Sequence, residues 1–141
     1  MGRLQFQLPE QFAFSTEIPI RITDLNYGGH VGNDTVLMLI HEARIRFLAH
    51  LGYTELLFAG VSLIMADAGI EFRSELFYGD ALTVFVAAGD VGRAGFDLYY
   101  KLVKGPGQTV VAQAKTGMVC FDYPQKKVVS IPSAAREKLL G

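Results

Sequence analysis

The sequence has one cysteine, no tryptophan and no excess of charge of either sign. A single cysteine, Cys120, among 141 residues excludes an internal disulfide framework and fits a reducing compartment. The 13 Lys and Arg residues nearly balance the 14 Asp and Glu residues, which gives a net charge of −1. No cluster of basic residues marks a nucleic-acid surface, so a nucleic-acid partner is not expected.

Long apolar runs are also absent. The longest fall far below the ~18–20 residues that span a bilayer, and the N-terminal stretch MGRLQFQLPEQ lacks the apolar segment of a secretory signal. The length favours a single domain over residues 1–141. Hydrophobic residues make up 50% of the chain and charged residues only 19%, which predicts further burial in an oligomer interface. We therefore expect a cytoplasmic, self-associating protein without membrane insertion.

The chain has one strong helical pattern. Apolar residues at three- and four-residue steps predict a helix over residues 34–51, with Asn33 or Asp34 as its N-cap and Gly52 as its stop. The apolar stripe is so wide that we expect other structure to wrap most of the helix. The stripe contains Val36, Ile40, Ala43, Phe47 and Leu51, widened by Leu37, Leu39 and Leu48.

Strand patterns surround this helix. Residues 12–22 alternate so that Ile18, Ile20 and Ile22 point one way, and Pro19 suits an edge or outward position. Short turns join the last three strand-like segments, which favours an antiparallel meander. The later segments are strands at 61–75, 80–91, 95–104 and 108–122, a short helical turn around Thr54–Phe58, and a terminal helix at 134–140 capped by Ser133. This order predicts an α+β fold in which a curved antiparallel sheet wraps one long central helix.

Two groups of motifs give the chain a family resemblance. The stretch RITDLNYGGHVGN (21–33), followed by HEAR (41–44), resembles the pattern R-x-x-D-x-D-x-x-G-H-V-N-N and E-x-A-R of hotdog-fold thioesterases of the 4-hydroxybenzoyl-CoA thioesterase type. A second group, IEFR (70–73), GD (79–80) and GR (92–93), resembles that family's middle strand and later turns. The resemblance runs from about Phe14 to Leu139. It implies the hotdog fold, an acyl-CoA or acyl-carrier-protein thioester as substrate, hydrolysis to acid and thiol, and no cofactor besides the CoA of the substrate.

One departure from the family pattern concerns the expected catalytic carboxylate. The family's second Asp aligns with Asn26, and an asparagine cannot act as a nucleophile or base. Plant acyl-carrier-protein thioesterases are similar at His30 and have a glutamate in a segment like the one containing Glu75, so the resemblance implies His30 and Glu75 as catalytic candidates. Asp24 is a substitute carboxylate, and Asn26 can position water through its amide.

Thioester hydrolysis requires hydrogen-bond donors for the carbonyl oxygen and a base for the attacking water. The free N–H groups at the start of a helix supply such donors. Residues 24–34 enter the predicted helix directly, and the glycines there permit close backbone approach. We expect Gly29, Val31 and Asn33 to contact the substrate, and the resemblance implies that Arg93 contacts the CoA phosphates.

Each candidate also has a structural alternative. His30 can hydrogen-bond across a turn, Glu75 can be an exposed strand carboxylate or can reach the site of a partner subunit, and Asn26 can be a turn residue. Asp24 can pair with Arg21, which we favour, and Arg93 can belong to a solvated turn. Several apolar side chains can line an acyl tunnel, although core packing is the more frequent role. They are Phe47, Phe58, Leu63, Met65, Phe72 and Phe77.

The sequence therefore favours an acyl-CoA thioesterase that acts as a homodimer joined at sheet edges, with a homotetramer as the larger alternative. A non-catalytic acyl-thioester-binding protein of the same fold is the second hypothesis, because of Asn26. An acyl-thioester hydratase is a third and weaker one. The three histidines and one cysteine show no ligand spacing, so no metal is expected.

Overall fold

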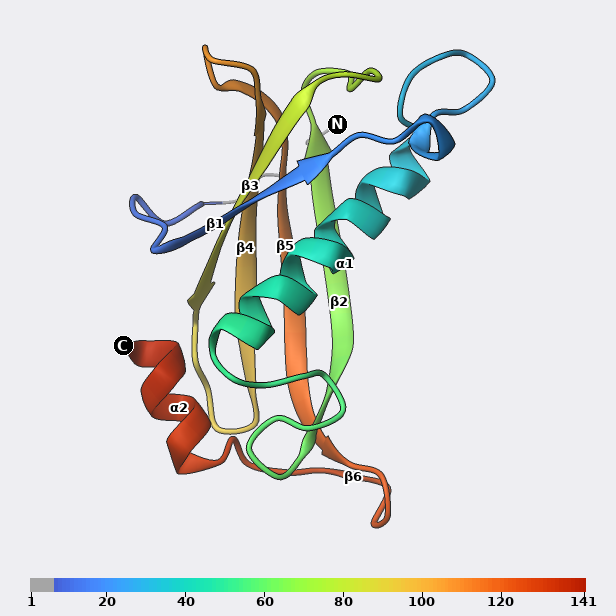
Figure 1. Cartoon of the computed structure of the whole chain (residues 1–141). Helices are drawn as coiled ribbons and strands as arrows, with labels where there is room; N and C mark the ends of the chain where they lie inside the picture. Colours follow the sequence, from blue (N-terminus) through green and yellow to red (C-terminus); the bar gives the residue numbers. More distant parts are fainter. Residues whose placement is uncertain (1–6) are drawn as a thin grey trace, which may run out of the picture.

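The structure, a computed structural model, describes residues 7–141. Its strands form one antiparallel sheet in the order β1-β3-β4-β5-β2, with β6 paired to β5 (Figure 1). The elements are β1 (Phe14–Pro19), the 3-10 helix η1 (Ile22–Asp24), α1 (Asn33–His50), β2 (Ser62–Phe72), β3 (Ala81–Gly89), β4 (Gly95–Lys104), β5 (Thr109–Asp122), β6 (Lys127–Val128) and α2 (Ser133–Leu140). The predicted α+β hotdog architecture and its meander, β3-β4-β5, are confirmed.

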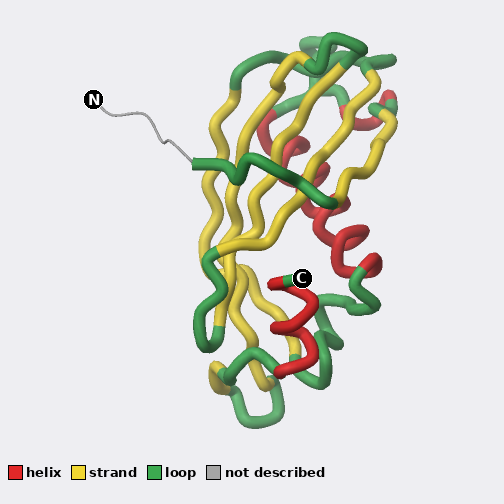
Figure 2. The backbone as a smooth tube through the Cα atoms, turned by 90° about the vertical axis from the view of Figure 1, so that its left-hand side faces the viewer, coloured by secondary structure: helices red, strands yellow, loops and turns green. Residues whose placement is uncertain are grey.

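The long helix α1 crosses one face of the curved sheet diagonally (Figures 1 and 2). Alternate side chains of β3 and β4 point toward this helix because successive strand residues face opposite sides. Val84, Val86 and Leu98 are fully buried in that layer. On the helix, Ile40, Ala43 and Leu48 complete the core, and α2 adds Ala135 and Leu139 at the far end.

The first strand is shorter than its alternation predicts. Ile18 and Ile20 are buried as expected, but Ile22 is 66% exposed, so its expected inward direction is wrong. The reason is that β1 ends at Pro19 and the chain tightens into η1 at Ile22, which breaks the two-residue period. Pro19 is exposed on an edge strand, as predicted.

The predicted N-caps are also wrong, whereas Gly52, with φ +89°, follows the C-cap of α1 as the predicted stop. Gly32, in an extended conformation, is the N-cap residue of α1, and the helix has no side-chain hydrogen bond from its N-cap. A Cβ at position 32 would lie 2.7 Å from the Asp34 carboxylate, so a larger residue there would require the exposed Asp34 side chain to move. Pro132 takes the N-cap of α2 and Ser133 is its first residue. Residues 54–58 form an irregular loop instead of a helical turn; the Glu55 carbonyl accepts a hydrogen bond from the Leu63 N–H in β2, and Phe58 forms an isolated bridge with Val61.

One side of α1 is not covered within the chain. Leu37, Met38 and Ile45 are 44%, 71% and 40% exposed, so the expectation that the helix is wrapped nearly all round is wrong for a single chain. The backbone of α1 lies closest to β1 and β3, and β2 forms the opposite edge of the sheet. An apolar helix flank and the unpaired outer edge of the 11-residue strand β2 therefore border the same side of the molecule.

No helix in residues 7–141 is long and apolar enough to span a bilayer.

Candidate functional site

The polar segment before α1 lies against the connection between β2 and β3. The Val31 N–H donates to the Leu76 carbonyl at 2.8 Å, and His30 forms an isolated antiparallel bridge with Phe77. These contacts join two loops that are far apart in the sequence. They also carry His30 to the end of β2, where Glu75 follows.

His30 and Glu75 are neighbours within one chain. The distance from His30 Nδ1 to Glu75 Oε1 is 3.8 Å, and the side chains are 36% and 63% exposed. His30 Nδ1 also lies 3.3 Å from the Val31 carbonyl. The pair is therefore accessible to water and close enough to exchange a proton through one water molecule. A partner subunit is not needed to bring these two groups together.

The start of α1 opens onto the same place. Its first intrahelical bond runs from the Val36 N–H to the Gly32 carbonyl, and no side chain of residues 7–141 accepts a hydrogen bond from the N–H groups of the first turn. Such groups, with the helix dipole, form a natural site for developing negative charge. A cavity of about 270 Å³ lies beside them. Its lining is His30, Val31, Asn33, Val36, Phe72, Arg73, Ser74, Glu75, Leu76 and Val111. The structure thus brings together His30, Val31, Asn33 and Glu75.

Asn26 occupies the turn before this cavity. Its side-chain Oδ1 accepts the Gly28 N–H at 2.9 Å, and its own N–H donates to the His30 carbonyl at 2.9 Å. This local turn matches the structural alternative for Asn26. Gly29 closes the turn with φ +83°, a conformation that strongly favours glycine, and it shapes the path of the chain toward His30.

Asp24 is tied to Arg21 and does not reach the cavity. Its carboxylate is 6% exposed and accepts the Arg21 backbone N–H at 2.8 Å and the Arg21 Nη2 at 3.1 Å. Burial raises the pKa of the Asp24 carboxyl, but the hydrogen bonds and charge of Arg21 outweigh that effect, and the pKa lies below its usual range. This geometry matches the structural role of Asp24 as an anchor of η1.

Arg93 lies at the other end of the sheet. It belongs to the β3–β4 hairpin, whereas Glu75 lies in the β2–β3 connection, and the nine residues of β3 between them span ~30 Å (Figure 1). The exposed Arg93 side chain donates to Ser130 at 2.9 Å. Within one chain, Arg93 is not brought to the cavity beside His30.

The apolar tunnel candidates divide into two groups. Phe47, Phe58 and Leu63 are at least 93% buried and belong to the core. Met65 and Phe72 are 48% and 44% exposed and line separate cavities along α1. Phe77, also 44% exposed, packs against the Lys104 ammonium instead.

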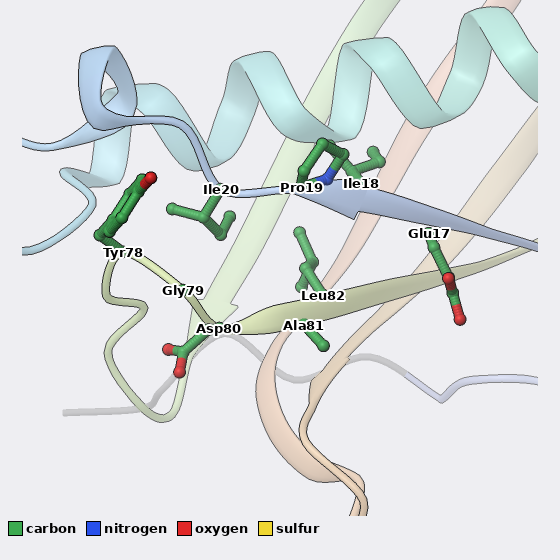
Figure 3. Close-up of a pocket in the computed structure, with 9 residues that line it drawn as sticks. All are labelled: Glu17, Ile18, Pro19, Ile20, Tyr78, Gly79, Asp80, Ala81 and Leu82. Atoms are coloured by element: carbon green, nitrogen blue, oxygen red, sulfur yellow. The ribbon is translucent and has the colours of Figure 1, made fainter.

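A larger cavity, about 500 Å³, lies between the end of β1 and the start of β3 (Figure 3). Figure 3 shows Tyr78 beside Ile20, while the Asp80 carboxylate points away from them. That carboxylate accepts the Phe77 N–H at 2.8 Å and lies 3.7 Å from Lys104 Nζ. The lining of this cavity includes none of the predicted site residues, so size does not identify the reactive site here.

Two basic residues near the predicted pair were not expected from the sequence in their observed roles. Lys104 donates to the Glu75 carbonyl and so fixes the backbone that carries the Glu75 carboxylate. Arg73 lines the cavity while it donates to Glu71 at 2.7 Å. The only sequence signal for Arg73 is its place in the IEFR motif, and Lys104 is separated from Glu75 by 29 residues.

Comparisons with known proteins agree with the fold. Residues 20–139 match the family model of the thioesterase-like superfamily. A 1,4-dihydroxy-2-naphthoyl-CoA hydrolase from Thermosynechococcus vestitus is 30% identical over 116 residues, which cover 80% of this chain and 79% of that protein. The crystal structure of Slr0204, a 1,4-dihydroxy-2-naphthoyl-CoA thioesterase from Synechocystis, superposes with a TM-score of 0.82 at 22% identity, covering 90% of this chain and 95% of that one. A thioesterase from Thermus thermophilus, complexed with coenzyme A and Zn, has a TM-score of 0.80 at 21% identity, covering 93% and 100%.

Proposed function

The chain belongs to the thioesterase-like superfamily and is a thioester hydrolase of the hotdog fold, and we propose that it cleaves acyl-CoA at the cavity lined by His30, Asn33 and Glu75. The observation that carries this proposal is the meeting of a histidine, a carboxylate and an uncapped helix start in one accessible cavity. The hydrolase from Thermosynechococcus vestitus, named for a CoA thioester, supports CoA as the thiol of the substrate. No cofactor besides that CoA enters the proposal.

The proposed reaction uses water as the nucleophile. The thioester carbonyl oxygen accepts hydrogen bonds from the first N–H groups of α1, which stabilise the negative charge that forms there. Glu75 takes a proton from a water molecule, whose oxygen attacks the carbonyl carbon, and His30 orients that water. The C–S bond then breaks with its electron pair on sulfur, and the proton held by Glu75 returns to the thiolate. The products are the free acid and CoA.

Asn26 makes a covalent route at the family's usual position impossible. Its amide lacks a nucleophilic carboxylate and is already engaged in the turn with Gly28. Among the described residues that line the cavity, Glu75 supplies the only carboxylate. Water activation by Glu75 is therefore the mechanism that the described residues support best.

We place this site in a homodimer. The unpaired edge of β2 can extend the sheet into a second copy, and the exposed flank of α1 supplies apolar surface beside it. If the two β2 strands pair antiparallel, the Ser62 end of one strand lies beside the Phe72 end of the other. That arrangement moves the partner subunit's Arg93 toward the site of the first chain, where its guanidinium can bind the CoA phosphates. The homotetramer as a larger assembly and the cytoplasmic location are predictions made from the sequence, and they stay predictions.

The decisive experiment measures release of free thiol from a panel of aliphatic and aromatic acyl-CoAs. Glu75→Gln and His30→Ala should each lower kcat by about 10²-fold or more, because the first removes the base and the second removes the group that orients the attacking water. Glu17→Gln is the matched control, since Glu17 is an exposed carboxylate on β1 outside the cavity lining, and it should retain wild-type kcat.

Two outcomes would overturn the proposal. Wild-type protein that releases no thiol above background would refute hydrolysis, and binding without turnover would then favour the acyl-thioester-binding alternative motivated by Asn26. Full activity of Glu75→Gln would instead refute the assignment of the base. Loss of water from a hydroxyacyl-CoA to give an enoyl-CoA would indicate the hydratase class.

A further inference from the structure

A buried arginine lies beneath the middle of α1. The Arg44 side chain is only 7% exposed, and its Nε donates to Glu55 Oε2 at 3.2 Å. Its Nη1 reaches the hydroxyl of Tyr100 at 3.4 Å, and that hydroxyl pairs with Thr116 Oγ1 at 2.7 Å. His41 binds the other oxygen of Glu55 at 2.9 Å. A charged and hydroxylated cluster thus sits where apolar side chains otherwise fill the fold.

One end of the Arg44 guanidinium remains unused. Nη2 makes no hydrogen bond to any residue of the described part of the chain, yet no buried side-chain nitrogen or oxygen there lacks a partner. Both statements hold only if Nη2 is in contact with open space. A cavity of about 250 Å³, which Arg44 and Thr116 line together, lies beside the guanidinium. The rest of its lining is Leu37, Met38, Ile40, His41 and Met65.

This cavity is aligned with the site at the start of α1. At 100° per residue, Asn33, Leu37, Ile40 and Arg44 share a stripe about 60° wide on the helix. Arg44 lies eleven residues beyond Asn33, which is ~17 Å along the helix axis. Helical side chains lean toward the N-terminus, so the guanidinium is nearer to the proposed thioester position than its Cα is. An acyl group that starts at the thioester and follows α1 therefore meets an apolar wall first and a cation last.

We infer that the cavity under Arg44 binds the far end of the acyl group and selects acyl groups that carry an oxygen acceptor there, a hydroxyl or a carboxylate. The inference rests on the proposed function, which places the thioester at the start of α1. The free Nη2 of Arg44 donates to the substrate oxygen, while Glu55 holds the guanidinium in position. A purely aliphatic acyl end would leave that buried donor without a partner, which is unfavourable.

The test compares three non-hydrolysable thioether analogues of CoA that differ only at the far end of an eight-carbon chain. They carry the octanoyl, the 8-hydroxyoctanoyl and the suberoyl skeleton. Calorimetric titration of the wild-type protein should give at least about tenfold tighter binding of one or both oxygen-bearing analogues than of the octanoyl analogue. The hydroxyl and carboxylate arms show which acceptor the cluster prefers. Equal binding of all three overturns the inference.

Variants locate the effect. Arg44→Met should abolish the preference for oxygen-bearing analogues, whereas Arg46→Met, which removes an arginine from α1 outside this cavity, should retain it. Should Arg44→Met not fold, Met65→Trp replaces it, because filling the cavity from the exposed edge should also abolish the preference. A preference that survives in the folded variant overturns the inference.

The binding assay also separates this inference from the proposed function. A preference in binding without turnover of any acyl-CoA refutes hydrolysis and supports the cavity assignment. Turnover without a preference refutes the cavity assignment alone.

Discussion

The hydrogen bond between Tyr100 and Thr116 allows a quantitative test of the buried cluster. Tyr100 is fully buried, Thr116 is 1% exposed, and their hydroxyl oxygens are 2.7 Å apart. Tyr100→Phe removes a hydrogen bond worth about 1 kcal/mol and leaves the Thr116 hydroxyl buried without its partner, which costs about 1 kcal/mol more. We therefore expect Tyr100→Phe to lower the free energy of unfolding by about 2 kcal/mol.

The matching change at Thr116 should cost less. Thr116→Val keeps the side-chain shape and removes the hydroxyl, but the Tyr100 hydroxyl retains the Arg44 Nη1 donor at 3.4 Å. We expect a loss of about 1 kcal/mol for this variant. The double variant removes both hydroxyls, so neither is left buried without its partner. It should therefore lose about 2 kcal/mol of unfolding free energy instead of the additive value of about 3 kcal/mol.

Urea unfolding measures the cycle. All four proteins are compared at one concentration, because self-association makes the apparent stability depend on concentration. The slope of free energy against urea should stay constant, which shows that the variants change stability and not the size of the unfolding transition. Additivity within about 0.5 kcal/mol would refute the coupling inferred from the 2.7 Å contact.

Three further changes probe other parts of the molecule. Asp24→Asn should lower the free energy of unfolding most at neutral pH. Arg21 depresses the folded pKa of Asp24, so the stabilisation by this carboxylate is present above its unfolded pKa of about 4 and is lost as pH falls through the lower folded pKa. Urea unfolding at a series of pH values should therefore show the stabilities of the two proteins converging in acid. Gly29→Ala should cost about 1 kcal/mol in unfolding free energy because φ is +83°, while Gly107→Ala, which meets no atom and has no positive φ, should stay near neutral; equal costs would contradict this explanation. Burial raises the pKa of the Cys120 thiol to about 11, so a thiol reagent at about pH 8 should label it only after unfolding, and rapid labelling of the native protein would disprove that burial.

The sheet and the long helix could be predicted because their signals are periodic. The sequence predicts the segment 95–104 with the bounds that β4 has, since its alternation holds from Phe96 to Leu102: Phe96, Leu98 and Tyr100 are buried and the residues between them are less buried. The helix ends and Ile22 could not be predicted in this way. They depend on single backbone conformations, such as the extended Gly32, that leave no repeating pattern in the sequence.

The residues of the candidate site could be predicted from the sequence, but their arrangement in space could not. The motif around His30 and the carboxylate at Glu75 could be recognised, but the 3.8 Å between them results from a bridge between His30 and Phe77, which are far apart in the sequence. From the sequence, Arg44 could be recognised only as part of the HEAR motif. The burial of the Arg44 side chain and its free Nη2 depend on contacts with Glu55 and Tyr100, and both residues are distant from Arg44 in the sequence.

The contacts of Val31 with Leu76 and of His30 with Phe77 lie outside the regular sheet ladder. They join two loops at one end of the sheet, where Val31 and Leu76 belong to the buried core, whereas the His30 and Glu75 side chains are 36% and 63% exposed. Movement of two such exposed side chains requires far less free energy than global unfolding. The histidine and the carboxylate can therefore part and meet again on the folded protein, which gives a bulky acyl-CoA a way in without disturbing the core. Changes in loop length at this end can accordingly alter the reaction while the sheet keeps its stability.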